Sequence, residues 1–123
     1  MDQPPPKPLE WIGSSLDDLS GFPPPVKRTF GFALRAAQNG ARSLDAVPLK
    51  GFGGAGVLEI IEDFDGDTYR AVYTVKFAGV VYVLHAFQKK SKHGIKTPQH
   101  EMEVIRRRLE TARRMHEERG TQT

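Results

Sequence analysis

The chain reads VLEIIED over residues 57–63, TYRAVYTVKF over 68–77 and VVYVLHAFQ over 80–88. These three segments are rich in β-branched and aromatic residues, which favour β-strands. An Asp-Gly pair at 65–66 separates the first two segments and an Ala-Gly pair at 78–79 separates the last two, and such pairs are typical of hairpin turns. The segments therefore predict an antiparallel β-meander.

The middle segment alternates between two faces, because successive residues of a strand point in opposite directions. We expect one set of residues to face the core: Tyr69, Ala71, Tyr73, Val75 and Phe77. We expect the other set on a partly solvated face: Arg70, Val72, Thr74 and Lys76. The third segment is apolar on both faces, so other elements should cover it on both sides.

Segments with helical spacing flank the meander. The first is expected from Pro24 to Asn39, before Gly40, and its apolar stripe consists of Val26, Phe30, Ala33, Leu34 and Ala37. The second is expected to begin at Thr97-Pro98 and end at Gly120, with a stripe of Met102, Ile105, Leu109, Ala112 and Met115.

The remaining segments complete the predicted architecture. A short strand over about 9–13 and one serine-capped helical turn over 16–19 precede the first helix, and residues 41–56 are expected to be a loop. We predict an α+β fold in which the meander and the N-terminal strand form one sheet, helices pack on one face, and a C-terminal helix completes the domain. The helix from Pro24 is expected on the face that holds Tyr69, Tyr73 and Phe77.

A length of 123 residues suits one domain with a single core. We assign residues 1–8 to a flexible proline-rich arm, 9–118 to the domain and 119–123 to a tail. The absence of cysteine excludes disulfides, thiol nucleophiles and cysteine-based metal sites. The apolar runs are too short to span a membrane and the N-terminus lacks the features of a secretory signal, which predicts a cytoplasmic protein.

Charge is distributed unevenly along the chain. Residues 1–69 contain six Lys or Arg against ten Asp or Glu, whereas residues 70–123 contain twelve against five. A basic half on a small protein indicates a polyanionic partner such as a nucleic acid. A solvated basic helix is the alternative explanation.

Patterns of metal ligands and of catalytic nucleophiles are missing from the sequence. The four histidines do not have zinc-ligand spacing. Asp63, Asp65 and Asp67 resemble the start of a calcium loop, but the glycine and the final glutamate are not at the required places, so a hairpin tip explains them better. We expect a protein that uses neither a metal nor a cofactor.

Residues 85–96 read HAFQKKSKHGIK and contain four lysines, two histidines and no acid. With Arg70 and Lys76 of the neighbouring strand, this run predicts a basic pocket beside Phe87, a combination that binds and stacks single-stranded RNA. The alternative is a solvated lysine loop that protects an edge of the sheet.

Five short motifs together resemble a known family: PLKG (48–51), LEI (58–60), YRAVY (69–73), LHAFQKK (84–90) and KTP (96–98). With the order of the predicted elements, they make the chain from Leu9 to Arg114 similar to the phage-derived Gp49-like branch of the RelE/HigB toxin superfamily. The resemblance implies a RelE-like fold and a toxin of a type II toxin–antitoxin pair. Such toxins cleave mRNA, usually in the ribosomal A site, and a helix-turn-helix antitoxin of the HigA/Xre-like type is the implied partner beside mRNA and the ribosome.

The resemblance also implies roles for individual residues. Arg70 matches the strand arginine of the family, Lys89 and Lys90 match its basic pair, and Lys50 matches the lysine before its glycine turn. Many relatives have arginine where this chain has Ile61, so one expected phosphate contact is missing. That departure leaves open a weaker enzyme, a substitute residue such as Lys76, or a binding protein on the same scaffold.

RNA cleaves itself when its 2′-hydroxyl attacks the adjacent phosphorus. An enzyme therefore has only to position the strand, remove that proton, neutralise the phosphorane and protonate the departing 5′-oxygen, and needs no metal. Arg70 is expected to stabilise the transition state, because a guanidinium offers a planar fork of donors to phosphoryl oxygens. Lys89, Lys90 and His85 are expected to complete the catalytic set, although His85 is alternatively a buried polar residue of its strand. The expected RNA-binding residues are Lys50, Lys76, Phe87, Lys92, Lys96, Arg113 and Arg114.

Two other functions fit the same residues. One is a non-catalytic RNA- or protein-binding module of phage origin, which uses the basic run only to hold phosphates. The other is a regulatory partner of a DNA-binding antitoxin. Arg70→Ala separates an enzyme from a binder, because only an enzyme has cleavage to lose.

Overall fold

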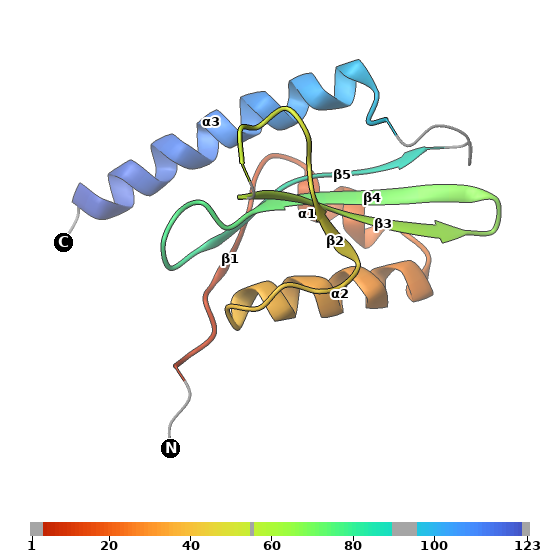
Figure 1. Cartoon of the computed structure of the whole chain (residues 1–123), viewed down its shortest axis with the longest axis horizontal. Coiled ribbons are helices and arrows are strands. Elements are labelled where there is room, and N and C mark those ends of the chain that lie inside the picture. Colours follow the sequence, from red (N-terminus) through yellow and green to blue (C-terminus); the bar gives the residue numbers. More distant parts are fainter. Residues whose placement is uncertain (1–3, 55, 90–95, 122–123) are drawn as a thin grey trace.

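Five strands and three helices make up the computed structural model, which describes residues 4–54, 56–89 and 96–121. In chain order they are β1 (Leu9–Trp11), α1 (Ser15–Ser20), α2 (Pro24–Gln38), β2 (Ala46–Pro48), β3 (Val57–Phe64), β4 (Asp67–Thr74), β5 (Val81–Lys89) and α3 (Gln99–Thr121). The strands form one sheet in the order β1-β5-β4-β3-β2 (Figure 1). β1 runs parallel to β5, and the other neighbours are antiparallel.

The predicted meander is present as β3, β4 and β5. Asp65 and Gly66, between β3 and β4, have φ angles of 51° and 88°, the left-handed conformation that a two-residue hairpin turn requires. The strand alternation holds from Tyr69 to Tyr73, and the strand then ends at Thr74, three residues earlier than predicted.

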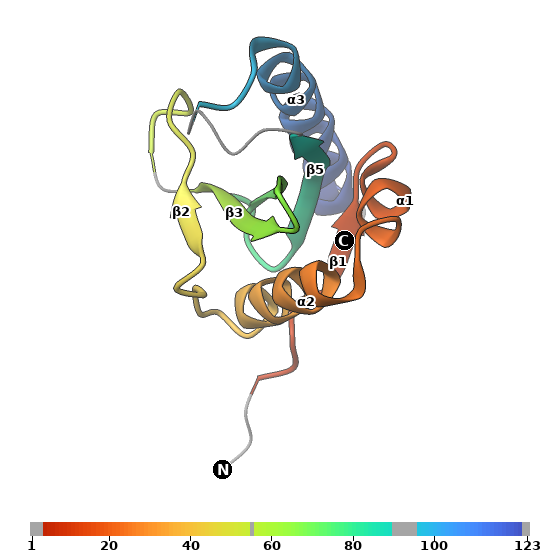
Figure 2. The same cartoon turned by 90° about the vertical axis from the view of Figure 1, so that its right-hand side faces the viewer.

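Helices cover both faces of the sheet (Figure 2). α2 packs on the face that holds Tyr69 and Tyr73, as predicted, while α3 lies across the opposite face. The buried residues of α2 are those of the predicted stripe: Val26, Phe30, Ala33, Leu34 and Ala37. The α+β class and the sheet with a C-terminal helix are therefore confirmed.

The face beneath α3 is buried, whereas the sequence predicted a partly solvated face. Arg70 is 2% exposed and Val72 is fully enclosed, because the apolar stripe of α3 closes over them. Phe77 also belongs to this side, since its ring meets that of Tyr82 edge-on at 5.7 Å. The expectation that Phe77 faces α2 is wrong, and Val75, expected in the core, is 36% exposed because it lies beyond the end of β4.

β2 lies within the stretch that was expected to be a loop. It pairs with β3 at the edge of the sheet, and only Ala46 of its three residues is buried. A strand this short, which also includes Pro48, has no alternation long enough to indicate its presence.

Three helix details also differ from the prediction. The Ser15 hydroxyl donates a hydrogen bond to the carbonyl of Val83 at 3.1 Å and makes no capping bond to the α1 backbone. α3 does not end at Gly120 but continues to the next residue. On α3, Met115 was expected on the inner face but is 36% exposed. His116 lies on the inner face instead, where its ring contacts those of Phe77 and Tyr82.

The end of the proline-rich arm is tied to the sheet and to α2. The Lys7 amide donates to the Gln38 carbonyl and the Gln38 side chain donates back, both at 2.8 Å, and the Val81 amide donates to the Pro8 carbonyl at 3.0 Å. The boundary at residue 9 stays a prediction. None of the described helices is both long enough and apolar enough to cross a membrane.

Candidate functional site

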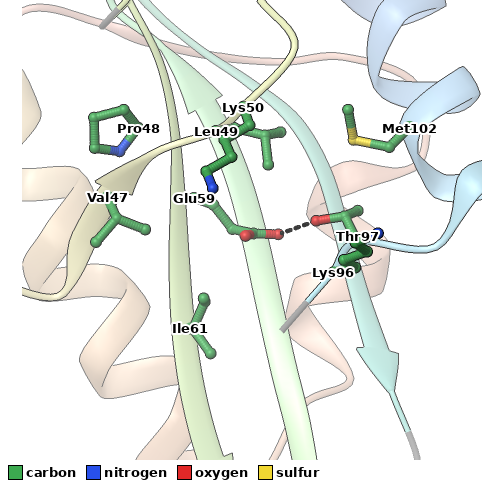
Figure 3. A pocket seen from close by; sticks show the side chains of 9 residues that line it. All are labelled: Val47, Pro48, Leu49, Lys50, Glu59, Ile61, Lys96, Thr97 and Met102. Atoms are coloured by element: carbon green, nitrogen blue, oxygen red, sulfur yellow. Dashed lines mark hydrogen bonds between the residues drawn. The ribbon is translucent and has the colours of Figure 1, made fainter. Parts of the chain in front are cut away.

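A pocket of about 520 Å³ lies between β2, β3 and the start of α3 (Figure 3). Its lining comes from three separate parts of the chain: Val47, Pro48, Leu49 and Lys50, then Glu59 and Ile61, then Lys96, Thr97 and Met102. The walls are mainly aliphatic. Lys50 and Lys96 are exposed at its rim, so the pocket combines an apolar interior with a cationic entrance.

Glu59 forms the floor of the pocket and is only 3% exposed. The Thr97 hydroxyl donates a hydrogen bond to its Oε2 at 3.1 Å, the contact drawn in Figure 3, and Arg70 Nη1 donates to both carboxylate oxygens at 3.4 Å. Burial raises the pKa of Glu59, although the charge of Arg70 and the hydrogen bond from Thr97 act in the opposite direction. An ionisable group thus lies at the base of the pocket.

Arg70 lies next to Glu59 on the same face of the sheet. The register of the sheet places Arg70 opposite Ile61 of β3 on one side and opposite Phe87 of β5 on the other. Its Nη1 also contacts the Thr97 hydroxyl at 3.4 Å. The expectation that Arg70 projects into an open pocket is wrong, because Thr97 and α3 cover it and its charge is matched by Glu59.

His85 belongs to a polar network that joins β5 to α3. Arg108 Nη1 donates to His85 Nδ1 at 3.2 Å, so Nε2 carries the hydrogen and donates to Glu101 at 2.9 Å. The same Arg108 nitrogen donates to the Leu84 carbonyl at 3.0 Å. His85 is 7% exposed, which agrees with the alternative of a buried polar residue.

Phe87 is not the exposed stacking surface that the sequence predicted. Its ring stacks on that of His85 at 5.2 Å between centroids, and it is 7% exposed. The network around His85 and α3 therefore occupies the place that a base was expected to take.

The lysines of the basic run divide into two groups. Lys89, at the end of β5, donates from Nζ to the carbonyl of Lys96 at 3.4 Å, so it lies next to a lining residue without itself lining the pocket. Lys90 and Lys92 lie outside the described residues. Lys50 and Lys96, predicted from distant parts of the sequence, meet at the same pocket.

Besides Phe87, three predicted RNA-binding residues do not line the pocket. Lys76 lies just beyond Thr74, the last residue of β4, and its side chain packs against Gly56. Arg113 and Arg114 lie on the second half of α3, and Arg113 forms ion pairs with Glu110 and Glu117 of the same helix. The expected meeting of Lys76 with the basic run is therefore corrected by the fold, whereas RNA binding by Arg113 and Arg114 stays a prediction.

Sequence reasoning did not select Glu59, Thr97, Glu101 or Arg108 as site residues. Glu59 did carry a signal, because an acid between Leu58 and Ile60 interrupts a buried strand. Glu101 and Arg108 carried none, since their contact with β5 depends on how α3 crosses the sheet. Across the described ranges, no group of three or more His, Cys, Asp or Glu residues is placed to hold a metal ion.

Comparisons with known proteins give a family and a structural likeness. Residues 17–110 match the family described as "Phage derived protein Gp49-like (DUF891)". A chain of the toxin–antitoxin complex RelBE2 from Mycobacterium tuberculosis is similar over 74% of this chain and 100% of its own, with 20% sequence identity and a TM-score of 0.40. No curated protein matches the chain.

Proposed function

This chain belongs to the phage-derived Gp49-like family, and we propose that it is the toxin of a toxin–antitoxin pair and cleaves mRNA at the pocket beside the start of α3. The observation that carries the proposal is the pocket itself, which is lined by exposed Lys50 and Lys96 and by the buried Glu59, the ion-pair partner of Arg70. Cations at the entrance attract the phosphates of RNA, and the enclosed floor excludes water from the bound segment.

The proposed reaction is metal-independent transesterification. The 2′-oxygen of one nucleotide attacks the adjacent phosphorus, the bond from phosphorus to the 5′-oxygen breaks, and the proton lost by the 2′-hydroxyl is balanced by one gained by the 5′-oxygen. The protein has to hold the strand and stabilise the charge that develops on the phosphoryl oxygens. Lys89 contacts the carbonyl of Lys96, and we assign Lys89 and Lys90 to this charge and to proton transfer.

Arg70 is the residue proposed to stabilise the transition state. Its ion pair with Glu59 has to open before the guanidinium meets the reacting phosphate, and an entering phosphate competes with the carboxylate for the same donors. His85 is proposed to act through its contacts with Glu101 and Arg108, which fix the first turns of α3 over the site. It is therefore a positioning residue in this proposal.

The proposed partners are a helix-turn-helix antitoxin, mRNA and the ribosome, and the proposed place of action is the cytoplasm. The experiment is expression of the chain alone in bacteria, followed by primer extension on a translated message. Growth and translation should stop, and a cognate antitoxin should restore both. Normal growth with unchanged translation, while soluble protein accumulates, contradicts the toxin role.

Site variants connect the activity to the pocket. Lys89→Ala with Lys90→Ala should lower cleavage by at least about 10²-fold, the scale of losing one charge-stabilising donor. Arg70→Lys should lower it similarly, because lysine keeps the positive charge opposite Glu59 but loses the planar fork. Lys76→Ala, at a cation away from the pocket, is the matched control and should leave cleavage unchanged.

The buried state of Arg70 favours one alternative function, a non-catalytic RNA-binding module. In such a protein the Glu59–Arg70 pair only supports the pocket, and the lysines hold the phosphate backbone. Full RNA affinity without any cleavage of a translated message supports this alternative.

A further inference from the structure

The interior of the pocket suits a flat organic ring. Its walls are the aliphatic side chains of Val47, Pro48, Leu49, Ile61 and Met102. A volume of about 520 Å³ lies within the range of about 300–1,000 Å³ typical of pockets that enclose small ligands. A nucleobase, which is planar and largely apolar on its faces, fits such walls.

The entrance suits a ligand that carries negative charge next to that ring. Lys50 reaches the rim from the segment after β2, and Lys96 reaches it from the segment before α3. Lys89 lies next to Lys96, because its Nζ donates to the Lys96 carbonyl at 3.4 Å, but it does not itself line the pocket. Apolar walls beneath several lysines are the complement of a nucleotide, with the base inside and the phosphates at the rim.

The floor determines which polar groups the base has to present. Thr97 donates to Glu59 Oε2 at 3.1 Å, and Arg70 Nη1 donates to both oxygens at 3.4 Å. A carboxylate that receives donors from two sides offers only acceptors to a ligand. Contacts of 3.4 Å are long for N–H···O hydrogen bonds, so N–H groups placed closer to the carboxylate replace them.

We propose that this pocket binds a guanine base and that Glu59 recognises it, an inference that rests on the proposed function and specifies the RNA that the site accepts. Guanine presents two adjacent N–H donors, N1–H and N2–H, on its Watson–Crick edge. Adenine and cytosine each present one donor beside an acceptor, and uracil presents one donor between two acceptors. Only guanine therefore makes two parallel hydrogen bonds to a carboxylate.

Recognition of guanine also affects Arg70. When the two N–H groups of the base bond to Glu59, they replace the long contacts from Arg70 Nη1. The guanidinium then turns toward the phosphate that the rim lysines hold, where it forms stronger charge-assisted hydrogen bonds. Guanine in the pocket thus promotes cleavage of the RNA that carries it.

The test measures binding without any cleavage step. The four nucleoside 3′-monophosphates are titrated separately into the full chain by isothermal titration calorimetry. Guanosine 3′-monophosphate should bind at least about tenfold more tightly than the other three, the discrimination expected of one bidentate contact. Equal affinities for all four nucleotides overturn the proposal.

Two variants and one control connect the preference to the pocket. Glu59→Gln should bring the guanosine and adenosine nucleotides to within about twofold of each other, because the carboxamide cannot accept two parallel N–H bonds. Met102→Trp fills the pocket without changing Glu59 or Arg70, so it should weaken guanosine binding by at least about tenfold. Met115→Trp, on the exposed side of the same helix, should change neither affinity.

The outcomes separate this inference from the proposed function. Selective guanosine binding by a chain that cleaves no message supports the guanine pocket and contradicts the ribonuclease. Cleavage of a message by a chain without guanosine preference overturns the guanine pocket alone. A preference that survives both Glu59→Gln and Met102→Trp also overturns it, because the base then binds elsewhere.

Discussion

Glu59 and Arg70 lie side by side beneath α3, with 4% and 2% of their side chains exposed. Removing one partner of a buried ion pair leaves the other charge without compensation. We expect Arg70→Met to lower the free energy of unfolding by about 3–5 kcal/mol, and Arg70→Met with Glu59→Leu to recover most of that loss. Urea unfolding of the three proteins checks this, and equal losses in the single and double variants contradict it.

The same carboxyl makes stability depend on pH. Burial raises the pKa of Glu59 above its ordinary value of about 4.5, so at a pH between the two values the folded chain binds this proton more tightly than the unfolded chain. The stability from this group is therefore complete below about pH 4.5 and is lost as pH rises through the raised pKa. We expect the free energy of unfolding of Glu59→Gln to fall less with rising pH than that of the wild type. Urea unfolding from about pH 4.5 to about pH 8 measures both.

Glu110 provides a control, because its pKa is shifted in the opposite direction to that of Glu59. A hydrogen bond from Arg113 lowers the pKa of Glu110, so its contribution is present above the ordinary value and is lost as pH falls through the lowered pKa. Because Glu110 is exposed on α3, solvent screens the effect and Glu110→Gln should change the pH profile little. Identical slopes for wild type and Glu59→Gln between mildly acidic and neutral pH contradict the raised pKa.

The contact between Glu59 and Arg70 could be predicted from the sequence, but the burial of the pair could not. The turn at 65–66 sets the register of β3 and β4, which places Ile61 opposite Arg70 and puts Glu59 diagonal to it. Diagonal residues on one face of an antiparallel pair lie within reach of long side chains. α3 covers the pair from more than 25 residues further along the chain, and local patterns do not indicate where a distant helix packs.

At the scale of the elements, α2 and the first hairpin each contain a glycine that allows a direct test. Gly31 lies on the exposed side of α2 with open space at the position that a Cβ would occupy, whereas Gly66 has a φ of 88°. Gly31→Ala should stabilise the chain by about 0.5–1 kcal/mol, because alanine loses less backbone entropy in a helix. Gly66→Ala should destabilise it by about 1–2 kcal/mol, because alanine is strained at positive φ. Thermal unfolding measures both, and shifts of the same sign contradict this account.

The elements that the sequence predicted well are those with long and regular patterns. α2 repeats its apolar stripe over about three turns, and its buried residues are the predicted ones. β2 has three residues, and Phe77 follows the end of β4, so neither has a period to count. The inner face of α3 was misassigned near its end, because His116 bonds to the Tyr82 hydroxyl at 3.0 Å and replaces an apolar contact.

At the scale of the molecule, the fold concentrates cations at one place and neutralises them at another. Lys50 and Lys96 meet at the pocket, with Lys89 in contact with the Lys96 carbonyl, although the loop after β2 and the segment before α3 are far apart in sequence. On the second half of α3, Arg113 is paired with two glutamates. The excess of basic residues in the second half of the chain therefore does not act as one uniform surface.

This distribution predicts which residues make RNA binding depend on salt. Each cation that contacts a phosphate of single-stranded RNA adds about 0.7 to the slope of log affinity against log salt. Under the proposed function, Lys50→Ala with Lys96→Ala should lower that slope by about 1.4, because both amines are exposed at the pocket. Arg113→Ala with Arg114→Ala removes the same formal charge but should lower it less, because Glu110 and Glu117 already compensate Arg113. Titration of a short unstructured RNA between about 50 and about 200 mM salt measures both slopes, and a larger change in the arginine variant places the RNA along α3 instead of at the pocket.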